Sequence, residues 1–225
     1  MEKLCADLHI HTLYSKDSLS RVEDVLAAAE KKGLHAIAIT DHDEIDGAFE
    51  ARDLARQKGL ALQVIIGEEV STDRGDLLVY FLKKRIAPGR LGDVLAEVKR
   101  QGAVCSAAHP YDFVRHGINL EQLPTRQLSA IRAVEAFNAR VSVPAHNPRA
   151  EKFALSHGKA LLAGRDAHHT SEIGAAFVEF EGVQELDAKS LLSAKRTLGG
   201  KLSPKYVHLF SRYAVLRKKL GWAAP

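Results

Sequence analysis

Short apolar runs alternate with longer amphipathic segments along most of the chain. An apolar run of about four to eight residues, bounded by glycine or polar residues, is typical of a buried strand. Seven runs are predicted as strands on this basis, and an eighth strand is expected after them. The predicted strands are residues 3–10, 35–40, 62–67, 77–82, 103–108, 130–137, 160–164 and 175–180.

Amphipathic segments follow several of these runs and are predicted as helices. They cover residues 21–32, 44–58, 91–101, 145–157 and 187–198. Continuous apolar strands followed by helices indicate a parallel sheet that is covered on its outer face. About seven such units in succession predict an α/β fold, in which the sheet forms a closed or nearly closed barrel.

Length and composition fit one large soluble domain. The chain has 225 residues, of which 46% are hydrophobic and 27% charged. It has no run of about 18 apolar residues, which a membrane span would need, so no membrane partner is expected. Its first residues lack the apolar run of a signal peptide, which favours a cytoplasmic protein. Cys5 and Cys105 lie in apolar runs and are expected to be buried, reduced thiols.

The charge is distributed unevenly along the chain. The net charge is +4, yet no Asp or Glu follows Asp187, while nine of the 32 basic residues do. The residues up to Asp187 therefore hold 23 basic and 28 acidic side chains and are mildly acidic. We expect a barrel domain over residues 1–182 and a basic, helical C-terminal extension over residues 183–225.

The basic extension contains a predicted amphipathic helix. Ser203 is a candidate N-cap, with Pro204 at the first helical position. One apolar stripe is expected to pack on the barrel and to leave a solvated basic face. The alternative is that this face attracts nucleic acid or another polyanion. The stripe consists of Tyr206, Leu209, Tyr213, Leu216 and Leu220.

Polar side chains with the chemistry of metal ligands follow six of the seven predicted strands. In the first strand His9 and His11 are two residues apart, so both face one side and converge. Two exposed histidines on an edge strand would be the simpler reading of this pair alone. The other strand ends read TDHD at 40–43, GEEVS at 67–71, AHP at 108–110, EAFN at 135–138 and GRDAHH at 164–169.

The repetition of this pattern at one rim indicates a metal site. Functional side chains of a barrel gather where its strands end and the following loops begin. A buried cluster of carboxylates and imidazoles is unstable unless positive charge compensates it. Divalent metal ions supply such charge, and nitrogen and oxygen ligands without sulfur suit manganese, zinc or iron.

These motifs resemble the PHP family, the polymerase and histidinol phosphatase type of phosphoesterase. The resemblance extends over most of residues 4–182 and rests on DLHIHTLYSKDS, TDHDEIDG, GEEVS, AHP and GRDAHHTSEIG. It implies a distorted barrel of seven β/α units with the metal site at the C-terminal rim of the strands. The ligands that it implies are His9, His11, Asp17, His42, Glu69, His109, Asp166 and His168.

One departure from the family pattern concerns the third metal. Many relatives with three ions carry a histidine on the fourth strand, where this chain has Leu77 or Leu78. Either two ions suffice, or another residue such as Glu135 contributes. The expected cofactors are therefore two or three divalent ions.

Two or three metal ions predict hydrolysis of a phosphate ester. Paired ions activate a water molecule and stabilise the charge that develops on phosphate oxygens. Asp41, beside His42, either orients a ligand or moves a proton, and Asp7 is expected to be structural. Arg115 and His116, on the loop after AHP, are candidate contacts for a phosphate or carboxylate of the substrate.

Several functions remain open at this point. The expected substrate is a small phosphorylated molecule or a nucleotide. An oligonucleotide-trimming exonuclease is the close alternative, which the basic extension favours. A non-catalytic metal-binding scaffold belongs to another class, and hydrolysis of a carbon–nitrogen bond is possible with the same paired ions.

Overall fold

Nine strands form a single sheet in the computed structural model, which describes residues 3–221. The strand order across the sheet is β7-β6-β5-β4-β3-β2-β1-β8-β9. The strands are β1 (Lys3–Ile10), β2 (Ala36–Ile39), β3 (Gln63–Val70), β4 (Leu77–Tyr80), β5 (Val104–Ala107), β6 (Ala133–Asn138), β7 (Ala160–Gly164), β8 (Ala176–Glu181) and β9 (Arg196–Gly200).

The fourth strand reverses direction within an otherwise parallel barrel sheet. β1, β2 and β3 pair in parallel, as do β5, β6 and β7, but β4 is antiparallel to both of its neighbours, β3 and β5. The expectation of a wholly parallel sheet is therefore wrong at β4. The cause is the short connection 71–76, which is too short for the crossover that parallel neighbours require.

The sheet curves until β1 and β7, the first and last strands of its barrel, lie close together. The backbone N–H of His11 donates to the carbonyl of Ala167 at 2.9 Å, and the N–H of Ala167 donates to the carbonyl of His9 at 3.1 Å. These bonds join the end of β1 to the segment after β7, which nearly closes the barrel. The predicted α/β barrel is thus confirmed, although the described elements do not follow a strict count of seven β/α units.

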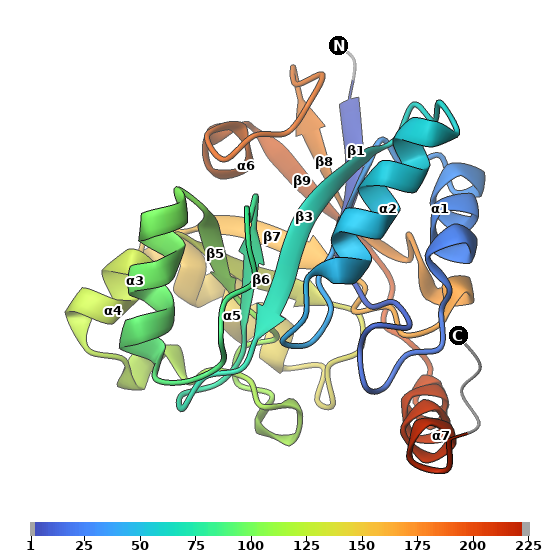
Figure 1. Cartoon of the computed structure of the whole chain (residues 1–225). Helices are drawn as coiled ribbons and strands as arrows, with labels where there is room; N and C mark the ends of the chain where they lie inside the picture. The colour runs from blue at the N-terminus through green and yellow to red at the C-terminus, as the bar shows by residue number, and fades with distance from the viewer. Residues whose placement is uncertain (1–2, 222–225) are drawn as a thin grey trace.

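Helices surround the barrel on its outer side (Figure 1). β8 and β9 continue the sheet beyond β1 as antiparallel strands. The α-helices are α1 (Val22–Lys31), α2 (Asp46–Gln57), α3 (Leu91–Gln101), α4 (Thr125–Ala130), α5 (His146–Ser156), α6 (Ser190–Ser193) and α7 (Val207–Lys219). Three short 3-10 helices are η1 (Phe113–Arg115), η2 (Leu120–Gln122) and η3 (Thr170–Glu172).

Two apolar clusters form the core. One lies inside the barrel and includes Leu8, Ile65 and Tyr80. Its members come from alternate positions along neighbouring strands. The other lies between the sheet and its helices and includes Ile37 and Leu95. Because apolar side chains fill the barrel interior, polar chemistry is confined to its ends.

Helix α7 lies at the end of the molecule toward which β3 points (Figure 1), and its orientation differs from the prediction. Val207 and Ala214 are its buried residues. The apolar stripe that was expected to pack on the barrel faces outward instead. The exposed fractions are 60% for Tyr206, 60% for Leu209, 57% for Tyr213, 55% for Leu216 and 49% for Leu220.

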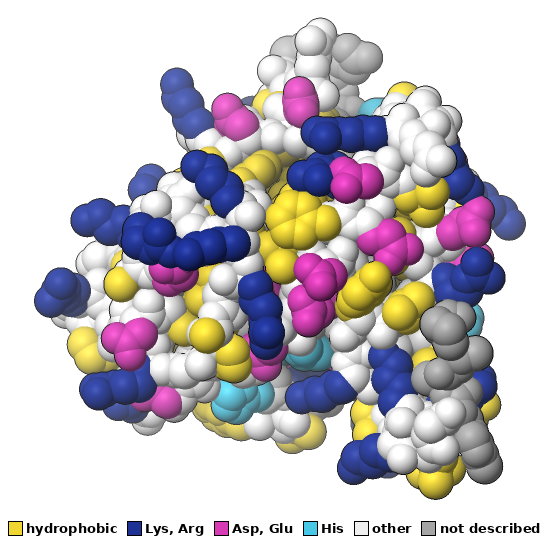
Figure 2. Space-filling model, viewed as in Figure 1, with side chains coloured by type: hydrophobic (Ala, Val, Ile, Leu, Met, Phe, Trp, Pro, Cys, Tyr) yellow, Lys and Arg dark blue, Asp and Glu magenta, His cyan; other side chains and the backbone are white. Residues whose placement is uncertain are grey.

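The surface over α7 carries positive charge in the view of Figure 2. Dark blue and magenta side chains are interspersed over the barrel, whereas the region of α7 at the lower right shows blue without magenta. This follows from the absence of acidic residues after Asp187. The domain boundary expected at residue 182 stays a prediction, and the sheet continues past it through β9. Residues 3–221 contain no helix that could cross a membrane.

Candidate metal centre

The structure brings all eight residues of the expected ligand set together at one end of the barrel. Most of them are fully buried, and Asp17 and His42 are the partly exposed members. They come from the ends of β1, β2, β3, β5 and β7 and from the loops that follow these strands. The convergence of side chains that lie far apart in the sequence is the arrangement that the motifs predicted.

Glu69 is the centre of the cluster. Its carboxylate oxygens lie 3.1 Å from Nε2 of His9, 3.2 Å from Nε2 of His11 and 2.9 Å from Nε2 of His109. Nδ1 of His42 lies 3.3 Å from the same side chain. One carboxylate therefore faces four imidazoles, which suits a group that bridges ions.

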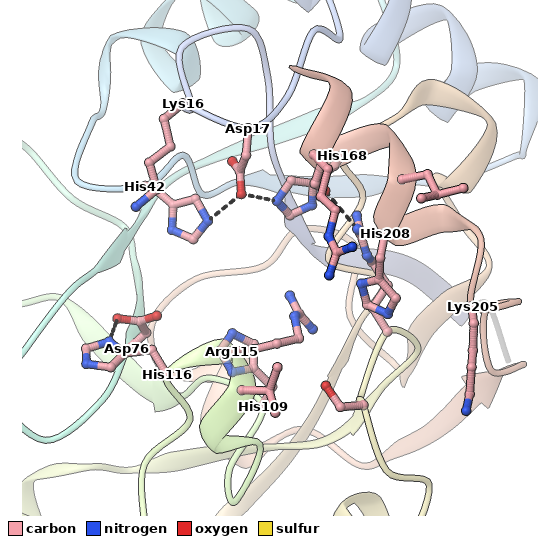
Figure 3. A pocket seen from close by; sticks show the side chains of 16 residues that line it. Lys16, Asp17, His42, Asp76, His109, Arg115, His116, His168, Lys205 and His208 are labelled. Atoms are coloured by element: carbon pink, nitrogen blue, oxygen red, sulfur yellow. Dashed lines mark hydrogen bonds and ion pairs between the residues drawn. The ribbon is translucent and has the colours of Figure 1, made fainter. Parts of the chain in front are cut away.

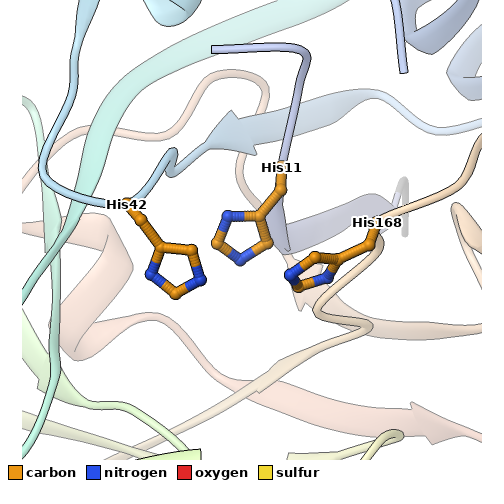
Figure 4. A group of neighbouring side chains, drawn as sticks. All are labelled: His11, His42 and His168. Carbon is orange, nitrogen blue, oxygen red and sulfur yellow. The ribbon is translucent and has the colours of Figure 1, made fainter. Parts of the chain in front are cut away.

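A second group surrounds Asp17. Its Oδ2 lies 3.0 Å from Nε2 of His168 and 3.5 Å from Nε2 of His42. The imidazoles of His11, His42 and His168 converge on one space (Figure 4), and their nitrogens lie within 4.8 Å of one another. Asp166 Oδ1, 3.4 Å from His11 Nε2, connects this group to the one around Glu69.

An irregularity in β1 directs its two histidines. The pairing register of β1 with β2 shifts between Asp7 and Ile10. Leu8 packs inside the barrel, yet Ile10 packs in the outer cluster. The shift lets His9 and His11 face the centre, with ring centroids 5.0 Å apart. A regular strand would have placed Leu8 and the two imidazoles on opposite faces.

Asp76 is a candidate ligand that the sequence analysis missed. It is buried, and its carboxylate lies within 4.8 Å of ligand atoms of both Glu69 and His109. Because β4 is antiparallel, the residue just before it lies at the rim where the other strands end. Leu77 and Leu78, where many relatives carry the histidine, lie within β4, whereas Asp76 directly precedes the strand.

Glu135 supports the cluster from behind. Its carboxylate lies 2.8 Å from Nδ1 of His9, and it accepts a hydrogen bond of 2.6 Å from the backbone N–H of His109. The amide of Asn138 donates to the same carboxylate at 3.0 Å. Partners of this kind fix the ring orientation of a metal-ligating histidine. Glu135 is thus placed to orient ligands, and it comes from the strand whose end the sequence had already marked.

The electrostatics of the cluster are those of a site that needs cations. Burial opposes the charged form of His9, but Asp166, Glu135 and Glu69 outweigh it and raise its pKa well above the ordinary value. Burial would likewise raise the pKa of Glu69, but His42 and His9 hold it well below its usual range. The buried carboxylates thus raise the pKa of His9, and the imidazoles lower that of Glu69, as expected where carboxylates need positive charge beside them.

Unpaired polar atoms also fit bound ions. Within residues 3–221, Oδ1 of Asp17 and Nδ1 of His109 are buried and have no hydrogen-bond partner. Nε2 of His11 and Oδ1 of Asp166, although 3.4 Å apart, also form no hydrogen bond of good geometry. Buried polar atoms without partners are rare in native proteins and call for a ligand or water. His109 and Asp166 also have positive φ angles of 26° and 59°, and such strained residues cluster at functional sites.

Asp41 lies outside this set of converging atoms. Its Oδ1 accepts hydrogen bonds from the backbone N–H of Thr12 at 2.6 Å and from the hydroxyl of Ser15 at 2.7 Å, and Oδ2 accepts one from Oγ1 of Thr12 at 2.6 Å. Oγ of Ser15 in turn lies 3.0 Å from Nδ1 of His11. Of the two roles that the sequence left open, the geometry favours orientation of a ligand over proton transfer. Asp7 accepts backbone N–H groups of Arg165 and Gly174, as expected of a structural residue.

A cavity of about 590 Å³ opens onto the cluster (Figure 3). Arg115 lies on its wall, and its guanidinium pairs with Asp166 and donates to Oδ1 of Asn138. His116 also lines the cavity, with its Nδ1 2.8 Å from Asp76. Both predicted substrate contacts therefore lie at the cavity, and each also touches a carboxylate of the cluster.

Helix α7 forms part of the same cavity wall and is anchored there by polar contacts. The buried guanidinium of Arg140 donates to the backbone carbonyl of Asp166, to Glu172, and to Val207 and Ser211 of α7. At the other end of α7, Nζ of Lys218 donates to the carbonyls of Leu13 and Ser15. These anchors explain why the apolar stripe of α7 can face outward.

Comparisons with known proteins show which family and which fold this chain resembles. The model of the PHP domain matches residues 7–194. An uncharacterised protein of Methanocaldococcus jannaschii is 31% identical over 179 residues, which are 77% of this chain and 69% of that protein. PsfC from Pseudomonas syringae superposes with a TM-score of 0.67 at 18% identity, over 98% of this chain and all of that chain.

A larger solved structure is also similar. It is a two-domain protein from Bacteroides vulgatus that contains a predicted PHP-like metal-dependent phosphoesterase. The TM-score is 0.71 at 18% identity, over 95% of this chain and 70% of that chain. At such identities, both superpositions show a shared fold and nothing more specific.

Proposed function

Because this chain belongs to the PHP domain family, we propose that it is a metal-dependent phosphoesterase that hydrolyses a phosphate ester of a small molecule or nucleotide. The observation that carries the proposal is the position of Glu69, whose carboxylate faces four imidazoles. Two of these, His42 and His109, line the cavity. A lone structural ion takes about four ligands, fewer than the donors gathered here.

The donor set groups into three neighbouring sites. His9, His11 and Asp166 would hold one ion, and Glu69, Asp76 and His109 a second. A third set also uses His11 and consists of His11, His42 and His168, with Asp17 beside the last two. Bound manganese, zinc or iron would supply an activated water and positive charge for the phosphate oxygens. Asp76, directly before the strand on which many relatives carry a histidine, would supply a carboxylate in its stead, and this supports a three-ion site.

The protein's own groups would bind and orient the ester. Arg115 lines the cavity and pairs with Asp166, so its guanidinium would contact a phosphate oxygen of an ester bound beside the candidate ligands. Planar guanidinium groups bind phosphate through paired hydrogen bonds. Asp41 would act through Ser15 on His11 and hold that imidazole in one orientation. Glu135 would do the same for His9.

An oligonucleotide-trimming exonuclease is the second candidate. The observation in its favour is that the cavity wall is rich in basic side chains, including those of α7. Such a wall would attract the backbone of a nucleic acid, and the attraction would weaken steeply with added salt. A small phosphorylated substrate fits a cavity of about 590 Å³ better than a long strand does.

Turnover of a substrate panel tests the proposal. The purified protein with manganese should hydrolyse at least one of a set of phosphomonoesters, nucleotide phosphates and short oligonucleotides. His109→Ala should abolish turnover while leaving the circular dichroism spectrum unchanged. His157→Ala, which removes an exposed imidazole at the end of α5, is the matched control and should retain full rate. Full activity of the His109 variant, or a wild-type protein inert toward the whole panel, would contradict the proposal.

A further inference from the structure

Large apolar side chains are exposed mainly on two segments that border the cavity over the candidate ligands. Within residues 3–221 eleven such side chains are exposed, of which five form the stripe of α7 and two belong to η1. Leu209 of the stripe and Val114 of η1, exposed by 60% and 86%, both line the cavity. Exposed apolar side chains that gather in one region mark an interaction surface, whereas scattered ones need no explanation.

A row of basic side chains follows one flank of the stripe. Lys205, Arg212 and Lys219 recur every seven residues, which is about two turns of a helix, so they lie along one line. All three are exposed, and none of them forms an ion pair within residues 3–221. Because no acidic residue follows Asp187, the segment that carries this row does not compensate its positive charge. The row therefore favours an anionic partner.

The other flank of the stripe borders a second cavity, of about 520 Å³. Helix α7 contributes four apolar side chains to it, those of Leu209, Phe210, Tyr213 and Ala214, and Leu19 also lines it. The stripe thus lies between a positively charged flank and a flank with apolar space. A phospholipid has matching parts, since it joins an anionic head group to apolar acyl chains.

We propose that the stripe of α7, its basic row and the exposed tip of η1 together bind the surface of an anionic lipid bilayer. A helix with an apolar face beside Lys and Arg lies in the interface of anionic membranes, and Tyr suits the boundary between the apolar and the wet side. The chain has no apolar run long enough to span a membrane, but a helix that lies on a bilayer needs none. This inference goes beyond the proposed function and does not depend on it.

A second copy of the chain fits this surface less well than a bilayer does. Two α7 helices packed through their stripes would bring their basic rows close together, and like charges beside such a seam oppose pairing. A bilayer meets no such repulsion, because its head groups carry the opposite charge. Helix α7 also lies at one end of the molecule (Figure 1), where a flat surface can reach it.

Sedimentation of the whole protein with lipid vesicles tests the surface. The wild type should bind vesicles that contain phosphatidylglycerol and phosphatidylcholine, and should stay in solution with phosphatidylcholine alone. Lys219→Gln, outside the lining of both cavities, should lower the partition coefficient by about fivefold. Leu209→Ser combined with Leu216→Ser should lower it by at least about tenfold, because two exposed apolar side chains are lost from the stripe.

Two control variants lie at the opposite end of the barrel. Leu155→Ser removes a leucine that is exposed by 63% near the end of α5, just before the chain enters β7. Lys31→Gln removes an exposed positive charge from the last turn of α1, before β2. Both should bind the anionic vesicles as the wild type does. Circular dichroism should show the same helix content in all variants, since every substituted side chain is exposed.

Three results would overturn the proposal. The first is a wild type that does not bind the anionic vesicles or that binds phosphatidylcholine alone equally well. The second is unchanged vesicle binding by the double leucine variant, which would reduce the effect to attraction of positive charge. The third comes from sedimentation velocity: a dimer that the double leucine variant abolishes, in a protein that binds no vesicles, would assign the stripe to a second copy.

Discussion

Oε1 of Glu135 lies 2.8 Å from Nδ1 of His9, and both side chains are buried. This contact fixes one ring nitrogen of His9 and leaves Nε2 directed at Glu69, 3.1 Å away. The same carboxylate accepts the backbone N–H of His109, so one glutamate behind the site holds two residues that face Glu69. Glu135 therefore helps to fix the geometry of the candidate metal centre from a position behind the candidate ligands.

Replacement of Glu135 should weaken metal binding more than it weakens the fold. Glu135→Gln keeps the shape of the side chain but removes the charge that polarises His9. We expect the affinity for manganese to fall by about 10–100-fold, as is usual when a ligand loses its supporting partner. Competition with a chelating dye measures this affinity. Glu151→Gln, on an exposed face of α5, should leave it unchanged.

Asp76 should determine how many ions bind. Asp76→Ala removes one carboxylate from the group with Glu69 and His109, so we expect the variant to bind one ion fewer than the wild type. Elemental analysis of the metal-loaded proteins gives the two stoichiometries. Asp93→Ala, at the start of α3, serves as the control for loss of an acidic residue elsewhere. An unchanged metal content in the Asp76 variant would show that this residue only supports His116.

Glu68 provides a test of buried charge that does not involve the metals. Burial raises its pKa from 4.5 to about 8. The folded state therefore binds more protons than the unfolded state between these pH values, and the free energy of unfolding falls as the pH rises through this window. The contribution of Glu68 is fully present below pH 4.5 and is lost above about pH 8.

Glu68→Gln should remove this dependence, since the amide oxygen can still accept the 2.8 Å hydrogen bond from the backbone N–H of Ile86. Relative to the wild type, the variant should gain stability progressively toward pH 8 and keep that gain above it. Chemical unfolding at a series of pH values measures the difference. Parallel curves for the two proteins would show that Glu68 does not titrate in this window.

Arg140 should matter for the docking of α7. Arg140→Met removes the bonds to Asp166, Val207 and Ser211, and it takes one of two guanidinium partners from the buried Glu172. Loss of one partner of a buried ion pair costs about 3–5 kcal/mol. Urea unfolding measures the loss. Arg100→Met, which removes an exposed pair on α3, should leave the free energy of unfolding nearly unchanged.

The sequence was sufficient to predict the barrel and to name most of the polar residues at its rim. Parallel strands end at the same edge, so His9, His42 and His109 could be placed together from their positions after apolar runs. Asp76 could not be found in this way, because it precedes a strand, and only the reversal of β4 brings it to the rim.

The C-terminal helix shows a different limit. Its apolar periodicity predicted a packed stripe, but the residues of α7 that are buried are Val207 and Ala214, and polar contacts of Arg140 and Lys218 anchor the helix. Periodicity reports which residues share a face, and it does not report which face meets the barrel. The exposed stripe and the inward basic groups follow from tertiary contacts alone.

Anomalous diffraction from crystals grown with manganese tests the central claim most directly. The account predicts at least two manganese peaks at the rim, with Glu69 contacting more than one of them and with His9, His109, Asp166 and His168 among the remaining ligands. Crystals saturated with manganese that show no anomalous peak within bonding distance of Glu69 would contradict it.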